Sequence, residues 1–155
     1  MTKKLYINIF RLLTVALAGL ALFRPMIEFA MLPTVIDLPK DDYAAIQEVN
    51  QSLAWLDVIR LASFISIIVL LFFEREHNRA FWPIRGAFMA QLLIVMLYVA
   101  FTLPINHTTF NWAYLPDSNW SWLRTEWEYS HALSAFAGAI SFVLLLLDLV
   151  WAKWR

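Results

Sequence analysis

The stretch 132-ALSAFAGAISFVLLLLDLV-150 decides the fold class, because its nineteen residues contain a single charged side chain, Asp148. A helix of about 20 apolar residues is long enough to cross the hydrocarbon core of a bilayer. The whole chain follows this trend, since 61% of its 155 residues are hydrophobic and only 15% are charged. An average soluble domain has about 25% charged residues. The composition therefore predicts an integral membrane protein.

Three further segments are apolar enough to form membrane-spanning helices. The pattern predicts a single all-α domain over residues 1–155, an integral membrane four-helix bundle. Its predicted spans are residues 5–32, 53–73, 83–103 and 132–151. Pro104 is expected to close the third span, since proline has no backbone N–H to continue a helix.

Basic residues predict how the bundle is oriented. Most of them lie near one side of the predicted membrane, at Lys3, Lys4, Arg11, Arg75, Arg79, Arg85, Lys153 and Arg155. The connections on the other side contain only Lys40 and Arg124. Cytoplasmic loops carry the excess of Lys and Arg in membrane proteins. We therefore expect a multi-pass protein of an inner or plasma membrane with both termini cytoplasmic.

The two outer connections are predicted to be partly helical. Residues 38–64 have Asp41 or Asp42 as a candidate N-cap and no later helix breaker, so the second helix should begin just after this pair and continue unbroken. A cap within residues 117–119 predicts that the fourth helix begins near Trp120. The second and fourth helices would then extend beyond the membrane and frame an outward-facing chamber.

Charged side chains inside the predicted spans indicate a site. Arg24 and Glu28 are four residues apart on the first helix, and Asp57 and Arg60 lie at a similar depth on the second. A charged residue in the bilayer costs roughly 2.5–3.5 kcal/mol on insertion scales, so such residues usually face the bundle and pair. We expect these four to meet His131. Alternatively, the pairs only lock the first two helices together.

The approach to the fourth span, 118-SNWSWLRTEWEYSH-131, is rich in aromatic and charged residues. Residues three, four and seven apart share a helix face. One such stripe consists of Arg124, Trp127, Glu128 and His131. Because an unperturbed histidine titrates near pH 6.5, His131 is a candidate general base, a metal ligand or a satisfied polar residue. The metal alternative would pair it with His107, although no two histidines have i, i+4 spacing.

The segments 103-LPINHTTFNW-112 and 122-WLRTEWEYSHALSAFAGAISFVLLLL-147 resemble the anthrone-oxygenase-like family of small four-helix membrane proteins. Much of this family is described only as a domain of unknown function. Its pattern is matched here by Pro104, Asn106, Trp112, Arg124, Trp127 and His131, and more loosely by Asn50. The family often has an arginine three residues after the histidine, where this chain has Ser134.

The resemblance implies an oxidoreductase that oxidises a flat phenolic anthrone with dioxygen and without a cofactor or metal. In this chain, His131, helped by Glu128 or Glu28, would remove a proton. Arg124 and Arg60 would stabilise the resulting anion. The expected substrate-binding residues are Asn106, Trp112, Trp127, Arg24, Asn50, Asp57 and Arg60.

Two other function classes fit the same residues. A binding or carrier module would hold a lipid or a quinone-like molecule in the chamber without reacting with it. A structural subunit would pack against another membrane protein, or against a second copy in a homodimer, through small residues. The candidate packing residues are Ala18, Gly19, Ala135 and Gly138. The expected partners are therefore the lipid bilayer and a hydrophobic aromatic small molecule or lipid. The net charge of +0 gives no reason to expect nucleic acid.

Overall fold

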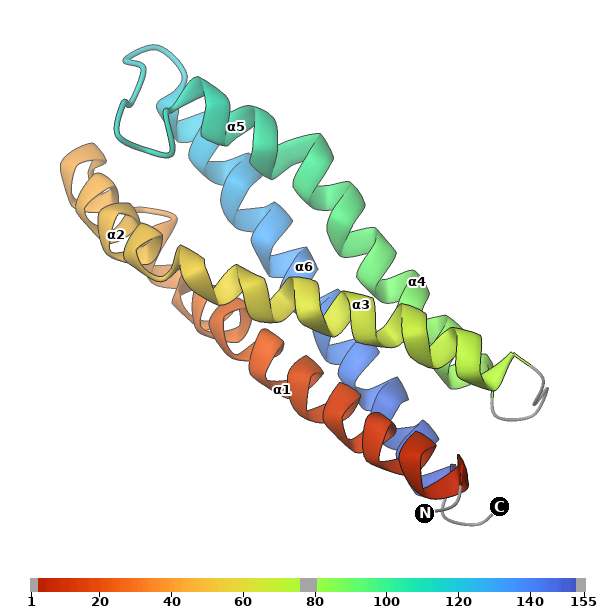
Figure 1. Cartoon of the computed structure of the whole chain (residues 1–155). Coiled ribbons are helices and arrows are strands. Elements are labelled where there is room, and N and C mark those ends of the chain that lie inside the picture. Colours follow the sequence, from red (N-terminus) through yellow and green to blue (C-terminus); the bar gives the residue numbers. More distant parts are fainter. Residues whose placement is uncertain (1–2, 76–80, 153–155) are drawn as a thin grey trace.

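A computed structural model describes residues 3–75 and 81–152 of the chain (Figure 1). The regular elements in this part of the chain are all helical, and no strand occurs among its residues. The α-helices are α1 (Lys3–Val35), α2 (Lys40–Ser52), α3 (Asp57–Glu74), α4 (Phe81–Leu97), α5 (Leu103–Thr108) and α6 (Trp120–Ala152). A 3₁₀ turn, η1 (Ala54–Leu56), precedes α3, and a π-helical turn, η2 (Tyr98–Thr102), joins α4 to α5.

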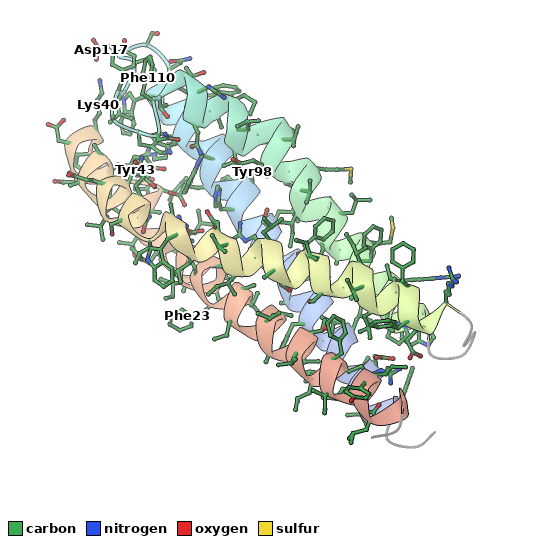
Figure 2. The ribbon with its side chains drawn as sticks, viewed as in Figure 1. Phe23, Lys40, Tyr43, Tyr98, Phe110 and Asp117 are labelled. Carbon is green, nitrogen blue, oxygen red and sulfur yellow. The ribbon has the colours of Figure 1, made fainter. Side chains whose placement is uncertain are left out.

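Within the described residues, four helical segments are long and apolar enough to cross a membrane. They are Leu5–Val35, Ala54–Glu74, Trp82–Thr108 and Trp120–Trp151. Large apolar side chains such as Phe23, Val58 and Phe136 are exposed, and Phe23 points away from the bundle (Figure 2). Such a contiguous apolar exterior is unusual for a soluble monomer. The prediction of an all-α chain with four apolar, membrane-length helices is confirmed.

The long helices run side by side, and both chain ends lie at the same end of the bundle (Figure 1). We call this the termini end, and we call the opposite end, which carries α2, the α2 end. Arg11, Arg75 and Arg85 belong to the half of the bundle nearer the termini end. Three more of the basic residues that predicted the orientation, Arg79, Lys153 and Arg155, lie outside the described residues, as do the side chains of Lys3 and Lys4.

Small residues on α1 and α6 serve packing within the chain. Ala18 and Ala135 are buried inside the bundle. A Cβ on Gly138 would lie 3.1 Å from Leu22 Cδ1, and one on Gly19 would lie 3.2 Å from Phe142 Cε2. The small side chains therefore let α1 and α6 approach each other closely. Ala18 and Ala135, which we expected as possible interface residues, are not available to a partner.

The second helix is broken, contrary to our prediction. The helix begins at Lys40 directly after Pro39, so Asp41 and Asp42 lie in its first turn instead of capping it. Negative side chains in the first turn interact favourably with the positive, N-terminal end of the helix dipole. The chain then turns through η1 before α3 begins at Asp57. Because Tyr43 on α2 is completely buried, tertiary packing holds α2 at an angle to α3.

The third span continues past Pro104, where we predicted it to end. Proline removes one backbone hydrogen bond and crowds the preceding turn of an α-helix. Here the π-helical turn η2 lies immediately before this point, and the chain then continues as α5 to Thr108. Helical π-turns of this kind absorb one extra residue and are frequent at functional sites. The fourth helix begins at Trp120, as predicted.

Candidate functional site

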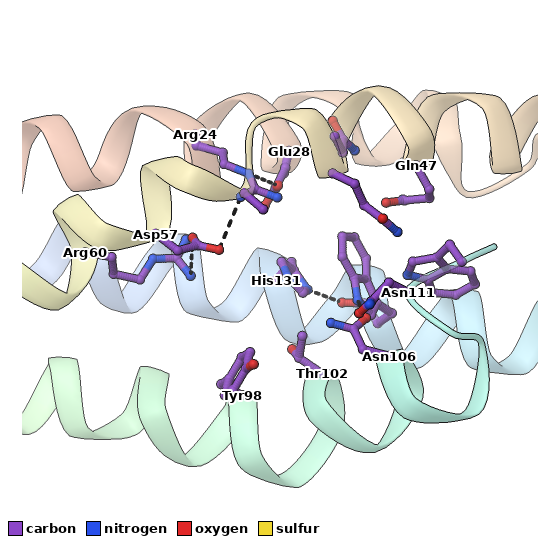
Figure 3. A pocket seen from close by; sticks show the side chains of 15 residues that line it. Arg24, Glu28, Gln47, Asp57, Arg60, Tyr98, Thr102, Asn106, Asn111 and His131 are labelled. Carbon is purple, nitrogen blue, oxygen red and sulfur yellow. Dashed lines mark hydrogen bonds and ion pairs between the residues drawn. The ribbon is translucent and has the colours of Figure 1, made fainter.

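A cavity of about 290 Å³ lies inside the bundle at the α2 end (Figure 3). Ligand pockets commonly measure roughly 300–1,000 Å³, so this volume suits a small molecule. Most of the predicted site residues line it together. These are Arg24 and Glu28 on α1, Asn50 on α2, Asp57 and Arg60 on α3, Asn106 on α5, Trp112 in the following loop, and Trp127 and His131 on α6.

Six further residues line the cavity and were not predicted from the sequence. They are Gln47, Gln51, Ala54, Tyr98, Thr102 and Asn111. Gln47 and Gln51 are four residues apart on α2, on the same face as Asn50, so a polar stripe was present as a signal. Tyr98, Thr102 and Asn106 also follow one another at intervals of four. That stripe was hidden because we expected the helix to end at Pro104.

His131 is held by its own helix. Its Nδ1 lies 2.8 Å from the carbonyl oxygen of Trp127, and the two rings stack with centroids 3.6 Å apart. A carbonyl oxygen can only accept, so Nδ1 carries the hydrogen and Nε2 of the neutral ring keeps its lone pair. The indole Nε1 of Trp127 donates to Asn106 Oδ1 at 3.1 Å. Asn106, Trp127 and His131 therefore form one connected, oriented unit.

Four charged residues form a network on the opposite wall of the cavity. Arg24 Nε donates to Glu28 Oε1 at 3.0 Å, and Arg24 Nη1 donates to Asp57 Oδ2 at 3.3 Å. Arg60 Nη1 lies 3.9 Å from Asp57 Oδ1. Arg24 thus connects α1 to α3, as the helix-locking alternative requires. The network is nonetheless incomplete, because Glu28 Oε2 is buried and has no hydrogen-bond partner.

Arg124 and Glu128 do not line the cavity, although we predicted both to act with His131. Arg124 Nη1 donates to the carbonyl oxygen of Leu38 at 2.6 Å, and its guanidinium lies 4.5 Å from the ring centroid of Trp120. Both residues lie on the face of α6 that is covered by α2 and by the turn before α2. We expected Glu128 in the cavity as a helper in proton removal and Arg124 there as an anion stabiliser. The structure places neither side chain in the cavity lining.

Glu128 instead anchors α2 on α6. Its Oε1 accepts from Tyr43 Oη at 2.9 Å and from Gln47 Nε2 at 3.3 Å. Burial raises the pKa of the Tyr43 hydroxyl well above its usual value, and the neighbouring Glu128 carboxylate raises it further. The phenol therefore stays protonated and keeps donating to Glu128. Because Gln47 also lines the cavity, this anchor holds part of the cavity wall.

The loop after α5 has an unusual backbone. Three consecutive residues have positive φ, at 48° for Phe110, 54° for Asn111 and 67° for Trp112. This left-handed conformation costs roughly 1–2 kcal/mol for a residue with a Cβ, so it has to be imposed by the fold. Asn111 N–H donates to the carbonyl oxygen of Asn106 at 2.7 Å, and Trp112 N–H donates to Thr109 Oγ1 at 3.0 Å. The loop thereby brings Asn111 and Trp112 to the cavity.

Trp112 is the aromatic centre of this loop. Its ring makes edge contacts with Tyr43 at 5.0 Å and Trp127 at 5.8 Å between centroids. Its Nε1 is buried without a hydrogen-bond partner. A buried donor of this kind needs an explanation. With Glu28 Oε2, it gives the cavity lining one unpaired donor and one unpaired acceptor.

A second hollow, of about 510 Å³, lies between α2 and this loop. It shares Gln51, Asn111 and Trp112 with the cavity. The rim contains Asp41 and Glu48. The three shared side chains therefore lie between the cavity and the second hollow.

The loop and α2 are also joined at the surface. Lys40 Nζ donates to Asp117 Oδ1 at 2.5 Å (Figure 2). Hydrogen bonding and attraction from this ammonium lower the pKa of the exposed Asp117 carboxyl. His107, the alternative metal ligand, is exposed on α5 and does not line the cavity. The described residues contain no group of three or more His, Cys, Asp or Glu side chains placed to hold a metal ion.

No protein-family model, curated protein or solved structure matches the chain. The resemblance to anthrone oxygenases therefore remains a prediction from the sequence.

Proposed function

We propose that the chain is a multi-pass protein of an inner or plasma membrane, with both termini cytoplasmic and the cavity facing outward. Four helices of membrane-spanning length and an apolar exterior support insertion. The excess of Lys and Arg in the segments that meet at the termini end supports this orientation. In this arrangement the charged network and His131 lie in the outer half of the bundle.

The cavity binds a small planar aromatic molecule, and His131 acts on it as a general base. The observation that carries this proposal is the state of the His131 ring. Its Nδ1 hydrogen is engaged by a backbone carbonyl and its face is stacked on Trp127, so Nε2 is the available base in the cavity. A positioned base typically contributes about 10²–10⁴-fold to a proton transfer.

The cationic groups that stabilise the developing anion differ from those expected from the sequence. Arg24 and Arg60 line the cavity with His131, whereas Arg124 does not. Fixed cationic donors aimed at developing charge are often the largest contribution to catalysis. We therefore assign charge stabilisation to Arg24 and Arg60. Trp112 and Trp127 supply aromatic surfaces for a flat ring system.

The reaction class is oxidation of an activated methylene group by dioxygen. His131 removes one proton from a ring carbon that a neighbouring carbonyl makes acidic. The carbanion transfers electrons to dioxygen, a carbon–oxygen bond forms, and the proton returns to give a hydroperoxide. Loss of water from the hydroperoxide leaves a carbonyl group. One dioxygen is consumed and one water is released per methylene oxidised, so the carbon is oxidised and the oxygen is reduced.

Oxygen uptake with a dihydroxyanthrone as the probe tests this proposal. The purified wild-type protein should consume dioxygen and form the corresponding quinone above the rate without protein. His131→Ala should lower this rate by about 10²–10⁴-fold. His107→Ala is the matched control, because His107 is exposed and outside the cavity. Full turnover by His131→Ala would show that His131 is not the base.

A second candidate function is binding or carrying a ligand without chemistry. Five carboxamide side chains line the cavity, on Gln47, Asn50, Gln51, Asn106 and Asn111. Carboxamides donate and accept hydrogen bonds but do not titrate, which favours recognition over proton transfer. Native mass spectrometry of gently extracted protein distinguishes the two candidates. A retained small molecule that stays unchanged in air, and is lost in Asn106→Leu, would favour the carrier.

A further inference from the structure

The cavity is open on one side of the bundle. The residues that line it from α1 and α6 are buried or half-buried. Its exposed lining residues come from other segments. The side chain of Asp57 on α3 is 54% exposed, and Tyr98 on η2 is 46% exposed. We call this opening the lateral slot; its rim consists of Gln51, Ala54 and Asp57 on one side and of Tyr98 and Asn111 on the other.

The lateral slot follows from the arrangement of α3 and α4. The two helices are neighbours at the termini end and diverge toward the α2 end (Figure 1). Asp57 and Tyr98 lie on facing sides of the cavity, and His131 lies between them in this view (Figure 3). A molecule that passes between α3 and η2 therefore arrives at His131.

Part of the lateral slot lies at membrane depth under the proposed insertion. Asp57 belongs to the candidate span Ala54–Glu74, and Tyr98 belongs to the candidate span Trp82–Thr108. Tyr98 is roughly 15 Å from the Thr108 end of its span, because a helix rises about 1.5 Å per residue. Large apolar side chains next to this part of the slot are exposed, namely Val58, Leu61, Val99 and Phe101. The slot therefore opens toward the acyl chains of the bilayer at Asp57 and Tyr98.

The rim of the slot is polar as well as apolar. Asp57 Oδ2 accepts from Arg24 Nη1 at 3.3 Å, and Asp57 Oδ1 lies 3.9 Å from Arg60 Nη1. A charge that faces hydrocarbon is costly, so an acyl chain is a poor neighbour for this carboxylate. A ring that carries a hydroxyl group can donate a hydrogen bond to it. The rim therefore favours a molecule that combines a flat apolar ring with hydroxyl groups.

A route from the water is more obstructed. The second hollow reaches the cavity only past Gln51, Asn111 and Trp112. The Trp112 side chain is 4% exposed and is wedged between Tyr43 and Trp127, with ring centroids at 5.0 Å and 5.8 Å. Moving this indole would break the packing that holds α2 and the loop. The half-exposed ring of Tyr98 is the smaller barrier.

We propose that the lateral slot is the entrance of the cavity, and that it admits hydroxylated planar aromatic molecules dissolved in the outer leaflet of the bilayer. This inference rests on the proposed membrane insertion and ligand class, but not on the action of His131 as a base. The substrate is thus taken from the membrane and not from the water.

Single cysteines on the two routes test the proposal, since the chain has none of its own. Tyr98→Cys and Ala113→Cys are reconstituted in lipid vesicles and alkylated with N-phenylmaleimide. Ala113 is exposed and lines the second hollow but not the cavity. The probe is a dihydroxyanthraquinone dissolved in the vesicles, and native mass spectrometry measures its loading after a short incubation. Alkylated Tyr98→Cys should lose loading relative to its unalkylated form, whereas alkylation of Ala113→Cys should leave loading unchanged.

Phe23→Cys is the matched control for an alkylated cysteine on the lipid-facing exterior, because Phe23 is exposed and points away from the bundle. Its loading should not change. The reverse pattern, in which only alkylated Ala113→Cys loses loading, would overturn the proposal in favour of entry from the water. Equal loading of all three alkylated variants, or equal loss in all three, would overturn it as well.

Reversing the order of addition separates a blocked entrance from a damaged binding site. Tyr98→Cys is first loaded with the quinone and then alkylated. If the slot is the entrance, the quinone should be trapped and its release into empty vesicles should slow. Loss of the quinone on alkylation would show that Tyr98 serves binding and not entry, and would overturn the proposal.

The quinone has no methylene group to oxidise, so its loading does not depend on the proposed reaction. Retention of the quinone by wild type without oxygen uptake from the anthrone would refute the reaction and leave the entrance standing. If wild type retains no quinone, the proposed ligand class and the entrance both fail.

Discussion

The two ends of the bundle each contain a group of paired charges, and the two groups are built differently. At the termini end, Arg11 pairs with Glu74 at 2.7 Å and with Asp148 at 2.9 Å. All three side chains are less than one-tenth exposed. At the α2 end, the side chain of Asp57 is 54% exposed and that of Arg60 is 26% exposed. Only the second group borders the cavity.

This difference distinguishes a structural cluster from a candidate site. The Arg11 cluster connects α1, α3 and α6, and one arginine serves two carboxylates. The network at the α2 end has two arginines for two carboxylates but leaves Glu28 Oε2 without a partner. It also lies beside a loop with three left-handed residues. We therefore expect the ion pairs at the termini end to contribute more to the free energy of unfolding. The polar groups at the α2 end are better placed to bind a ligand.

The largest expected effect is at the termini end. Arg11→Gln would leave the buried Glu74 and Asp148 without the cation that they share. Removing one member of a buried ion cluster typically destabilises a protein by about 3–5 kcal/mol. Unfolding followed by circular dichroism during titration with a denaturing detergent measures this loss. Turnover or ligand retention by the protein that remains folded should be unchanged, because the cluster does not border the cavity.

Arg60→Gln is the counterpart at the α2 end and should cost little stability. Its ion pair with Asp57 is long and partly exposed, and pairs of this kind contribute about 0–1 kcal/mol. If Arg60 stabilises an anion in the cavity, the same change should lower oxygen uptake by about 10²-fold. Both variants are measured under identical detergent conditions. Equal loss of stability in Arg11→Gln and Arg60→Gln would mean that both groups are structural, and the comparison would fail.

The anchor of α2 predicts a dependence on alkaline pH. Because the pKa of Tyr43 is raised in the folded protein, the folded state keeps its proton above pH 10 while the unfolded state loses it. Its contribution to stability is complete below about pH 10 and decreases above it, by up to about 1.4 kcal/mol per pH unit. Tyr43→Phe should remove this part of the slope between pH 9 and pH 11. The chain has five tyrosines, so the difference between wild type and Tyr43→Phe is the quantity to measure.

An unchanged slope in Tyr43→Phe would show that the pKa of this phenol is not raised in the folded protein. The result would also weaken the assignment of Glu128 to the α2 anchor. Tyr129→Phe is a suitable control, because Tyr129 is exposed.

The long helices were predictable because the bilayer requires long apolar runs, and few other structures need them. The break in the second helix was not predictable, since residues 40–60 contain neither glycine nor proline. Burial of Tyr43 and Gln47 against α6 holds α2 in its position. That contact is tertiary and leaves no local signal. The opposite error occurred at Pro104, where a strong local stop signal was accommodated by a π-helical turn.

The charged residues of the candidate site were predictable from the sequence. Arg24, Glu28, Asp57 and Arg60 stood out because charges in an apolar span are costly. Tyr98 and Thr102 carried no such signal, because they are uncharged, and Asn106 joins their stripe only because the helix continues through Pro104. Arg124 and Glu128 were misplaced for a different reason. A helical stripe gives the direction of a side chain but not the element that will cover it, and α2 covers this part of α6.

The smallest effect is expected from relieving backbone strain in the loop at the α2 end. Phe110 has a φ of 48° and is 71% exposed, so Phe110→Gly relieves left-handed strain and removes few contacts. Relief of roughly 1–2 kcal/mol is opposed by about 0.4–1 kcal/mol from the greater freedom of glycine in the unfolded chain. We expect a net stabilisation of about 0.5 kcal/mol in the same denaturation assay. Destabilisation would show that the loop is not strained at Phe110, and the α2 end would then differ from the termini end in its open charges alone.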